Sequence, residues 1–432
     1  RNGRPGDWPG SRNKNMQKKV SWPVLYRIQQ RFDETSIQDI AGAVREQFAE
    51  IRPGDRIKTG ETVAIGVGSR GTHDLKALVT TVVHCLRDMG LKPFIIPAMG
   101  SHGGGTGKGQ AKVLNDLGIT QDAVGAPIVS SMDVVSLGRL ESGAEVFFAK
   151  DALEADHIVV VNRVKPHTAF RGEVESGLCK ILAAGCGKQK GAYNMHKFDL
   201  GSTIVPAAQM ILGKAPVLCG LAVTENALGG TYSMELAKPE EFPEVDKKFL
   251  KRAWKLLPRL PIEDLDLLVV DEMGKDVSGA GMDPNVIGFW RREGGPRKPD
   301  YRALVVLDLT PQSHGNATGI GMADLTTRRM MDKIDLKATY MNALTSKVLR
   351  SARLPIALDN DQVALETAVD QVPNVDSIRM ARIVNTGSLG TFWASNALLP
   401  ELRAKEGITV DDKPIALEFN EEGRLRALKD EI

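Results

Sequence analysis

Cysteine, aromatic residues and net charge are all scarce in this chain of 432 residues, and each shortage excludes a class of protein. The four cysteines form no CxxC pair, which argues against a disulfide framework or a thiolate zinc site and is typical of cytoplasmic proteins. Aromatic residues make up 5% of the chain and the net charge is only +2, so neither base stacking nor bulk electrostatics favours nucleic-acid or membrane binding. No apolar run approaches the roughly 20 residues of a membrane-spanning helix. We therefore expect a cytoplasmic protein that binds neither nucleic acid nor membranes.

The chain is too long for one hydrophobic core, so two domains are expected. Residues 1–19 are basic, rich in Gly and Pro and without an apolar segment, which predicts a flexible tail rather than a secretory signal. Two prolines within residues 255–265 separate a charged helix from an apolar strand and indicate a boundary. We expect one domain over residues 20–258 and a second over residues 259–432. Whether about the last 30 residues return to the first domain stays open.

Apolar runs that end in glycine or a turn alternate with amphipathic stretches, which predicts an α/β fold with mostly parallel sheets. The expected strands are TVAIGVG (62–68), KPFIIPAMG (92–100), HIVVVNRV (157–164), PVLCGLAVTEN (216–226), DLLVVDEMG (266–274), YRALVVLDLT (301–310) and SIRMARIVNT (377–386). The expected helices are DLKALVTTVVHCLRDMG (74–90), QAKVLNDLG (110–118), ESGLCKILAAG (175–185) and GMADLTTRRMMDKID (321–335). Parallel strands place their carboxyl ends at one edge of a sheet, so functional side chains are expected in the segments that follow them.

Residues 66–71, GVGSRG, match the glycine fingerprint of dinucleotide-binding folds between a strand and a helix. The fingerprint also needs an acidic residue at the end of the next strand, but that strand ends in PFIIPAMG, and Arg70 lies inside the turn. A NAD site is therefore the least favoured interpretation. Two others stay open: a tight turn without a ligand, and an anion site formed by Arg70 and the helix N-terminus.

Two of the seven histidines follow predicted parallel strands. His102 lies in SHGGGTGKG directly after one strand, and His167 follows another. With Arg70 at a third strand end, these side chains are expected to converge on one crevice. Imidazole titrates near neutral pH, so the two histidines are candidates for acid/base chemistry. An ordinary loop role for each of them stays open.

Lys180 has only small residues one helical turn away in the predicted helix: Ser176, Gly177, Ala183 and Ala184. Small residues around an amine leave room for a flat ligand, which suits a lysine that binds or covalently holds a cofactor. The alternative is ordinary packing of the small residues, with the Lys180 side chain reaching out to solvent.

His196 follows Lys180 by 16 residues, after the glycine-rich segment GCGKQKG. Imidazole is the commonest protein ligand for metals such as nickel and zinc. The sequence has no HExxH pattern and no close cluster of ligands around His196. If a metal binds there, a group other than the protein must supply most of its coordination.

Together these segments resemble the nickel-dependent lactate racemase family, the 2-hydroxy-acid racemases and epimerases that carry a nickel-pincer nucleotide. The likeness is strongest over residues 60–200, and its signature is NRVKPHTAFRGEVESGLCK (162–180). The resemblance implies two α/β domains with the active site in the cleft between them. It also implies a cofactor, nickel-bound pyridinium-3,5-bisthiocarboxylic acid mononucleotide. Protein made in a host without the cofactor pathway is expected to lack it.

The resemblance also implies a role for each of these residues. Lys180 would anchor the cofactor through a thioamide, and His196 would bind nickel. His102 and His167 would exchange protons with the substrate on its two faces. The other expected cofactor contacts are Ser69, Arg70, Gly71, Thr72 and Gly177.

The sequence departs from the lactate racemases in ways that bear on the substrate. Val67 stands where those enzymes have an aspartate, and the interval between the second histidine and the lysine is longer. Lys275, Asp283 and His314, in second-domain loops, are expected substrate contacts, and a purely structural role stays open for each.

The expected reaction is racemisation or epimerisation of a 2-hydroxy acid by reversible hydride transfer. Lactate and a larger or more polar hydroxy acid both stay open as the substrate. The alternatives are a hydride-transfer oxidoreductase and an anion- or nucleotide-binding protein of the same fold without nickel chemistry. The sequence leaves both a monomer and a dimer open.

Overall fold

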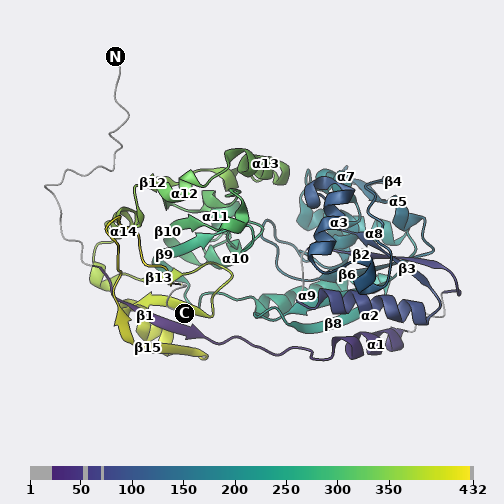
Figure 1. Ribbon diagram of the computed structural model, residues 1–432, viewed down its shortest axis with the longest axis horizontal. Coiled ribbons are helices and arrows are strands. Elements are labelled where there is room, and N and C mark those ends of the chain that lie inside the picture. The colour runs from purple at the N-terminus through teal and green to yellow at the C-terminus, as the bar shows by residue number, and fades with distance from the viewer. Residues whose placement is uncertain (1–21, 52–56, 70–72, 429–432) are drawn as a thin grey trace, which may run out of the picture. The chain divides into compact units, whose positions relative to one another are not determined.

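The computed structural model describes residues 22–51, 57–69 and 73–428 (Figure 1). The chain divides into two compact units, with the division between Leu257 and Pro258. One unit begins at Asp33, and the other combines the N-terminal strand with everything after Leu257. The predicted tail, residues 1–19, lies outside the described residues.

The first unit is built around a five-stranded sheet in the order β3-β2-β6-β7-β8. Its strands are β2 (Thr62–Val67), β3 (Lys92–Pro97), β6 (His157–Arg163), β7 (Val217–Glu225) and β8 (Thr231–Ala237). All pairs are parallel except β7 with β8. A separate antiparallel pair joins β4 (Val134–Arg139) to β5 (Glu145–Ala149).

Helices connect the strands of the first unit. The α-helices are α1 (Ile40–Ile51), α2 (Leu75–Asp88), α3 (Gly107–Asp116), α4 (Gln121–Val124), α5 (Lys150–Leu153), α6 (Leu178–Lys180), α7 (Lys188–Met195), α8 (Leu200–Leu212) and α9 (Phe242–Leu256). Shorter helical turns are η2 (Gly103–Gly105), η3 (Ile181–Gly185) and η4 (Pro239–Glu241). In the part of the chain that the structure covers, no helix has both the length and the hydropathy to cross a membrane.

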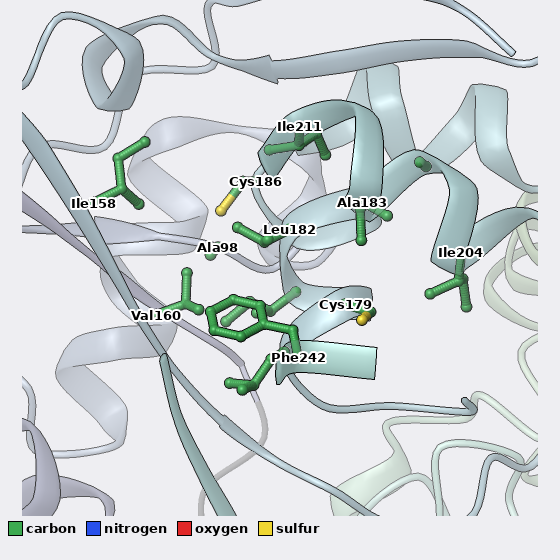
Figure 2. Packing of buried hydrophobic residues seen from close by; sticks show 14 of the residues in the cluster. Ala98, Ile158, Val160, Cys179, Leu182, Ala183, Cys186, Ile204, Ile211 and Phe242 are labelled. Carbon is green, nitrogen blue, oxygen red and sulfur yellow. The ribbon is translucent and has the colours of Figure 1, made fainter. Parts of the chain in front are cut away.

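Alternate residues of β6 enter two different hydrophobic cores, as the period of a strand requires. Val159 and Val161 pack in the cluster that contains the buried residues of α1 and α2. Ile158 and Val160 belong to the cluster on the other face, with Phe242 of α9 (Figure 2). The sheet is thus buried on both faces, which explains why its strands read as continuous apolar runs.

The second unit contains an eight-stranded mixed sheet in the order β12-β11-β10-β9-β13-β14-β1-β15. Its strands are β1 (Leu25–Gln30), β9 (Asp264–Met273), β10 (Asp300–Leu309), β11 (Leu325–Thr327), β12 (Ile356–Leu358), β13 (Met380–Ile383), β14 (Thr391–Ser395) and β15 (Ile408–Ile415). The pairs from β12 to β13 are parallel, and the others are antiparallel. The prediction of an α/β fold with mostly parallel sheets is confirmed.

The helices of the second unit are mostly short. The α-helices are α10 (Pro284–Ile287), α11 (Trp290–Glu293), α12 (Arg328–Asp332), α13 (Leu336–Ser346), α14 (Asp361–Val369) and α15 (Leu399–Arg403). Single helical turns are η5 (Pro311–Ser313), η6 (Ile320–Met322), η7 (Leu349–Ala352), η8 (Val375–Ser377) and η9 (Asn396–Leu398).

The strand β1 corrects the expected domain limits. Residues 20–32 were expected in the first domain, but β1 pairs with β14 and β15 and belongs to the second unit. Leu25 and Ile28 are fully buried in the cores of that unit. The last residues of the chain were left open as a possible return to the first domain. The strand β15 lies among them and pairs with β1, so residues 408–415 belong to the second unit.

The predicted helix over residues 321–335 is wrong. This segment forms η6, the short strand β11 and then α12. Thr326 and Thr327 are fully buried, and their hydroxyls donate hydrogen bonds to the carbonyls of Val306 and Leu307 at 2.8 Å. Consecutive β-branched residues suit a buried strand, and this preference outweighed the helical spacing of the methionines that follow.

Candidate functional site

The order of strands in the first unit reverses at β2, which has β3 on one side and β6 on the other. Ligands of open α/β sheets bind at such a reversal, beyond the carboxyl ends of the strands. Ser69 follows β2, His102 follows β3 and His167 follows β6. The space at this point is narrow, because a Cβ atom on Gly68 would lie 3.2 Å from Oδ1 of Asn162.

Ser69 and His102 form a hydrogen bond between Oγ and Nδ1 across the ends of β2 and β3. Gln110, a fully buried residue of α3, forms hydrogen bonds with the main chain around His102. Its Nε2 donates to the carbonyls of Gly100 at 2.7 Å and of His102 at 3.3 Å. Ser69, expected as a cofactor contact, therefore also orients the His102 ring.

A buried carboxylate caps the N-terminus of the helix that carries Lys180. Asp246 of α9 is fully buried, and its two oxygens accept the N–H groups of Leu178 and Cys179, each at 2.8 Å. Gly177 has φ of 99°, and a Cβ atom there would overlap Oδ1 of Asp246, so the close approach requires glycine. Burial raises the pKa of Asp246 to about 7, against the lowering effect of these hydrogen bonds.

This cap corrects the helix predicted over residues 175–185. The helix starts at Leu178 and continues as a π-helical turn, in which the N–H of Cys186 donates to the carbonyl of Ile181 at 2.7 Å. Ser176 and Gly177 therefore precede the helix and do not flank Lys180 on its face. Such π turns are frequent at functional sites.

An aromatic ring, and not small residues alone, lies beside Lys180. The half-buried ammonium lies 5.5 Å from the centroid of the Phe170 ring, and the His167 ring lies 4.3 Å from the same ring. Glu175 is buried and accepts the N–H of His167 at 2.8 Å. Burial raises the pKa of Glu175, although the His167 N–H and the charges of Arg171 and Lys180 act to lower it.

Gly100 is the point at which three of these segments meet. Its N–H donates to the carbonyl of Gly185, at the end of η3, at 3.1 Å. A Cβ atom on Gly100, which has φ of 59°, would lie 3.0 Å from Cβ of Ala192 in α7. His196 is half-buried and directly follows the last residue of α7, where its N–H donates to the carbonyl of Ala192 at 3.0 Å. The loop of His102, the helix of Lys180 and the helix of His196 are therefore in contact.

Lys188 was not foreseen from the sequence. It begins α7 with a positive φ of 53°, and its side chain is 99% buried. Its Nζ donates to the carbonyl of Pro97, at the end of β3, at 2.7 Å. Burial lowers the pKa of this amine. Lys188 thus fastens α7 to the strand that leads to His102.

In the second unit, the predicted contacts follow β9 and β10. Lys275 donates through Nζ to the carbonyl of Gly279 at 2.6 Å, and through its main chain to Oγ of Ser313 at 2.8 Å. Ser313 precedes the exposed His314, so the loops of Lys275 and His314 are joined. Asp283 caps α10, where its Oδ1 accepts the N–H at position 285 at 2.9 Å.

Arg70, Gly71 and Thr72 lie outside the described residues, so their predicted roles stay predictions. Among the residues that the structure describes, no group of three or more His, Cys, Asp and Glu side chains could hold a metal ion. A metal bound by His196 would therefore take its other ligands from outside this set.

Comparison with known proteins identifies the first part of the chain. Residues 13–201 match the family model described as the lactate racemase N-terminal domain. This region is therefore similar to that family, and the resemblance predicted from the sequence is confirmed.

A solved structure shows the same fold over most of the chain. The lactate racemase apoprotein from Thermoanaerobacterium thermosaccharolyticum matches with a TM-score of 0.52 and 13% sequence identity. The match covers 84% of this chain and 94% of that chain. No curated protein sequence matches the chain.

Proposed function

We propose that the protein is a nickel-pincer nucleotide-dependent racemase or epimerase of a 2-hydroxy acid. The observation that carries the proposal is the arrangement around Lys180. His167 and Lys180 lie against one aromatic ring, and the segments of His102, Lys180 and His196 meet at Gly100. The family of the first part of the chain supports a racemase in particular.

The residues present fit the cofactor. Lys180 is half-exposed near a helix start that Asp246 caps, which suits an amine that holds a nucleotide covalently. His196 would bind nickel, and the described residues offer no complete protein ligand set, which agrees with a metal held mainly by its own organic ligand. When bound, the cofactor supplies a reversible hydride acceptor.

His102 and His167 supply the proton chemistry in this proposal. Removal of a hydride from the substrate carbon requires that a base take the hydroxyl proton, and the reverse reaction returns that proton. The hydroxyl of Ser69 can either donate to Nδ1 of His102 or accept from it. Either neutral tautomer of His102 therefore keeps its partner, which suits a ring that takes a proton in one direction and returns it in the other.

Substrate contacts from the second unit are part of the same proposal. Lys275 and His314, whose loops are joined at Ser313, would contact the carboxylate or other polar groups of the hydroxy acid. Val67, in place of an aspartate, favours a substrate other than lactate.

The test uses protein coexpressed with enzymes that synthesise the cofactor. Single enantiomers of a panel of 2-hydroxy acids are incubated with it and separated by chiral chromatography. We expect the opposite enantiomer or epimer to form without an added oxidant. Accumulation of a keto acid would indicate an oxidoreductase instead. Cofactor-loaded protein that converts no member of the panel would contradict the proposal and favour a binding protein.

A further inference from the structure

The lysine at the start of α7 combines two unfavourable features beside the proposed site. Lys188 is a non-glycine residue with a positive φ of 53°, and it is 1% exposed. A positive φ outside glycine costs conformational energy, and burial of an amine costs the hydration of its charge. Departures of this kind from local preference concentrate at functional sites, so a function is expected for this residue.

The amine of Lys188 bonds to the edge of the sheet at the point where β3 ends. On this edge, the carbonyl of Ile95 accepts the N–H of Val129 at 2.8 Å. Carbonyls two residues apart in a strand point to the same side, so the carbonyl of Pro97 comes next along the edge. It accepts a hydrogen bond from Nζ of Lys188 at 2.7 Å. Because Pro97 is buried, the amine supplies the donor that this carbonyl requires.

The next residue of α7 contacts the far end of the loop that follows β3. A Cβ atom on Gly105 would lie 2.5 Å from Cδ of Gln189, so the Gln189 side chain lies directly against this glycine. The N–H of Gly105 in turn donates to the carbonyl of His102 at 3.2 Å. Lys188 and Gln189 therefore contact the two ends of the loop over residues 97–105, which carries His102.

The other end of α7 leads to His196, which directly follows the last residue of the helix. Asn194 attaches this end to β5, because its Nδ2 donates to the carbonyl of Glu145 at 2.6 Å. One short helix therefore provides both contacts to the His102 loop and also leads to the residue proposed to bind nickel.

We infer that Lys188 and Gln189 are positioning residues that hold the His102 loop in place relative to the helix of His196. The roles of the two histidines rest on the proposed function, whereas the placement of the loop does not. The hydrogen bond between Ser69 and His102 requires a defined position of the ring. Release of either end of the loop therefore weakens this hydrogen bond and lets the proposed acid/base group shift.

The placement is tested on the cofactor-free protein by NMR with isotope-labelled histidine. H102Q assigns the His102 signal, and S69A, which removes the partner of the ring, sets the direction in which the titration midpoint moves. K188M keeps the length of the side chain but removes the donor. We expect the His102 midpoint in K188M to move in the same direction as in S69A, by about 0.3 pH unit or more. Q189A should give a smaller shift of the same sign.

Two controls accompany this comparison. K190M changes an exposed lysine of the same helix and should leave the His102 midpoint unchanged. His157, at the start of β6 and bonded to Glu61 at 2.8 Å, is the internal reference, and its signal should stay in place in every variant. An unshifted His102 midpoint in folded K188M, or an equal shift in K190M, would overturn the inference.

Should K188M fail to fold, Q189A decides alone, because Gln189 is exposed and its truncation leaves the core intact. A His102 midpoint in Q189A equal to that of the wild type would then contradict the inference.

The cofactor-loaded protein gives a second readout. K188M should lower kcat by about 10- to 100-fold with KM little changed, because misplacement of an acid/base group affects the reaction more than it affects binding of the substrate. A raised KM with unchanged kcat would contradict the positioning of His102.

These outcomes are separable from those of the proposed function. If the loaded protein converts no hydroxy acid but K188M and Q189A still shift the His102 midpoint, the racemase proposal fails and the placement stands. If the loaded protein is a racemase but neither variant shifts the midpoint, only the placement fails.

Discussion

Carboxylates with little exposure to solvent have different partners in the two units of this protein. In the first unit, Asp246 accepts two main-chain N–H groups at the start of the helix that carries Lys180. In the second unit, Asp271 accepts two hydrogen bonds from the guanidinium of Arg382, at 2.7 and 2.9 Å. The first arrangement holds the start of the helix that carries the half-exposed Lys180, whereas the second pairs with the buried cation of Arg382 and also accepts the N–H of Leu428 at 3.1 Å. A buried carboxylate that accepts the main-chain N–H groups beside a proposed reactive side chain is therefore the better indication of a functional site.

The two carboxylates also differ in what opposes the effect of burial. Burial raises the pKa of Asp271, whereas the charge and hydrogen bonds of Arg382 and the N–H of Leu428 act to lower it. Asp246 has main-chain N–H groups and a thiol as partners, and its pKa reaches about 7. Asp246, which caps the helix that carries Lys180, therefore titrates in the neutral range.

The largest expected effect is a difference in activity between substitution of His167 in the first unit and of His314 in the second. H167Q removes a proposed acid/base group, so kcat for racemisation should fall by about 10²–10⁴-fold. H314Q removes a proposed substrate contact, so its effect should fall mainly on KM. Steady-state kinetics of the cofactor-loaded proteins measure both. A larger loss of kcat in H314Q than in H167Q would reverse the assignment of chemistry to the first unit.

Removal of Asp246 or of Asp271 should distinguish an effect on stability from an effect on the proposed site. D246A leaves two buried N–H groups without acceptors, and D271A leaves the buried guanidinium of Arg382 without a counter-charge, bonded only to the carbonyl of Arg426. Each should lower the free energy of unfolding in urea by about 2–5 kcal/mol. At a temperature where both variants are folded, only D246A should reduce cofactor attachment at Lys180. Equal attachment in both would show that the cap does not position the lysine.

The raised pKa of Asp246 gives a pH dependence of defined sign. The folded protein retains a proton on Asp246 up to about pH 7. The unfolded chain loses that proton near pH 4. Stability from this group is therefore present below pH 4 and is lost as pH rises through 7, by at most about 1.4 kcal/mol per pH unit. Urea unfolding of wild type and D246N at several pH values in this window measures it. The same slope in both proteins would exclude Asp246 as its source.

The smallest expected effect concerns the cap in the second unit. D283A removes the acceptor for the first turn of α10, which should cost about 1 kcal/mol. D283N should cost less, because asparagine caps a helix almost equally well. Thermal unfolding of both variants checks this order. A loss in D283A as large as that in D246A would remove the contrast between the two units.

The strands of the first unit could be predicted because each is a continuous apolar run between turns, as at residues 62–67 and 157–163. The position of β1 could not, because its partners β14 and β15 are more than 360 residues away in the sequence. The strand β11 was missed because three residues are too few to show a period.

The residues proposed to react with substrate and cofactor could be named from the sequence, but those that support them could not. His102 and His167 follow strands and stand beside glycines, which a single sequence displays. Asp246 looks like one more charge on an amphipathic helix, and its partners lie 67 and 68 residues away. The one local signal was Gly177, since a glycine directly before a helix can mark close approach of another group.

The central claim is that Lys180 holds a cofactor in a site built by the first unit. The most direct test is peptide mapping by mass spectrometry after coexpression with enzymes that synthesise the cofactor, alongside a lactate racemase made in the same cells. We predict an added mass confined to the peptide that contains Lys180, with bound nickel, and its loss in K180R but not in K190R. An unmodified Lys180 in cells where the lactate racemase is modified would contradict the account.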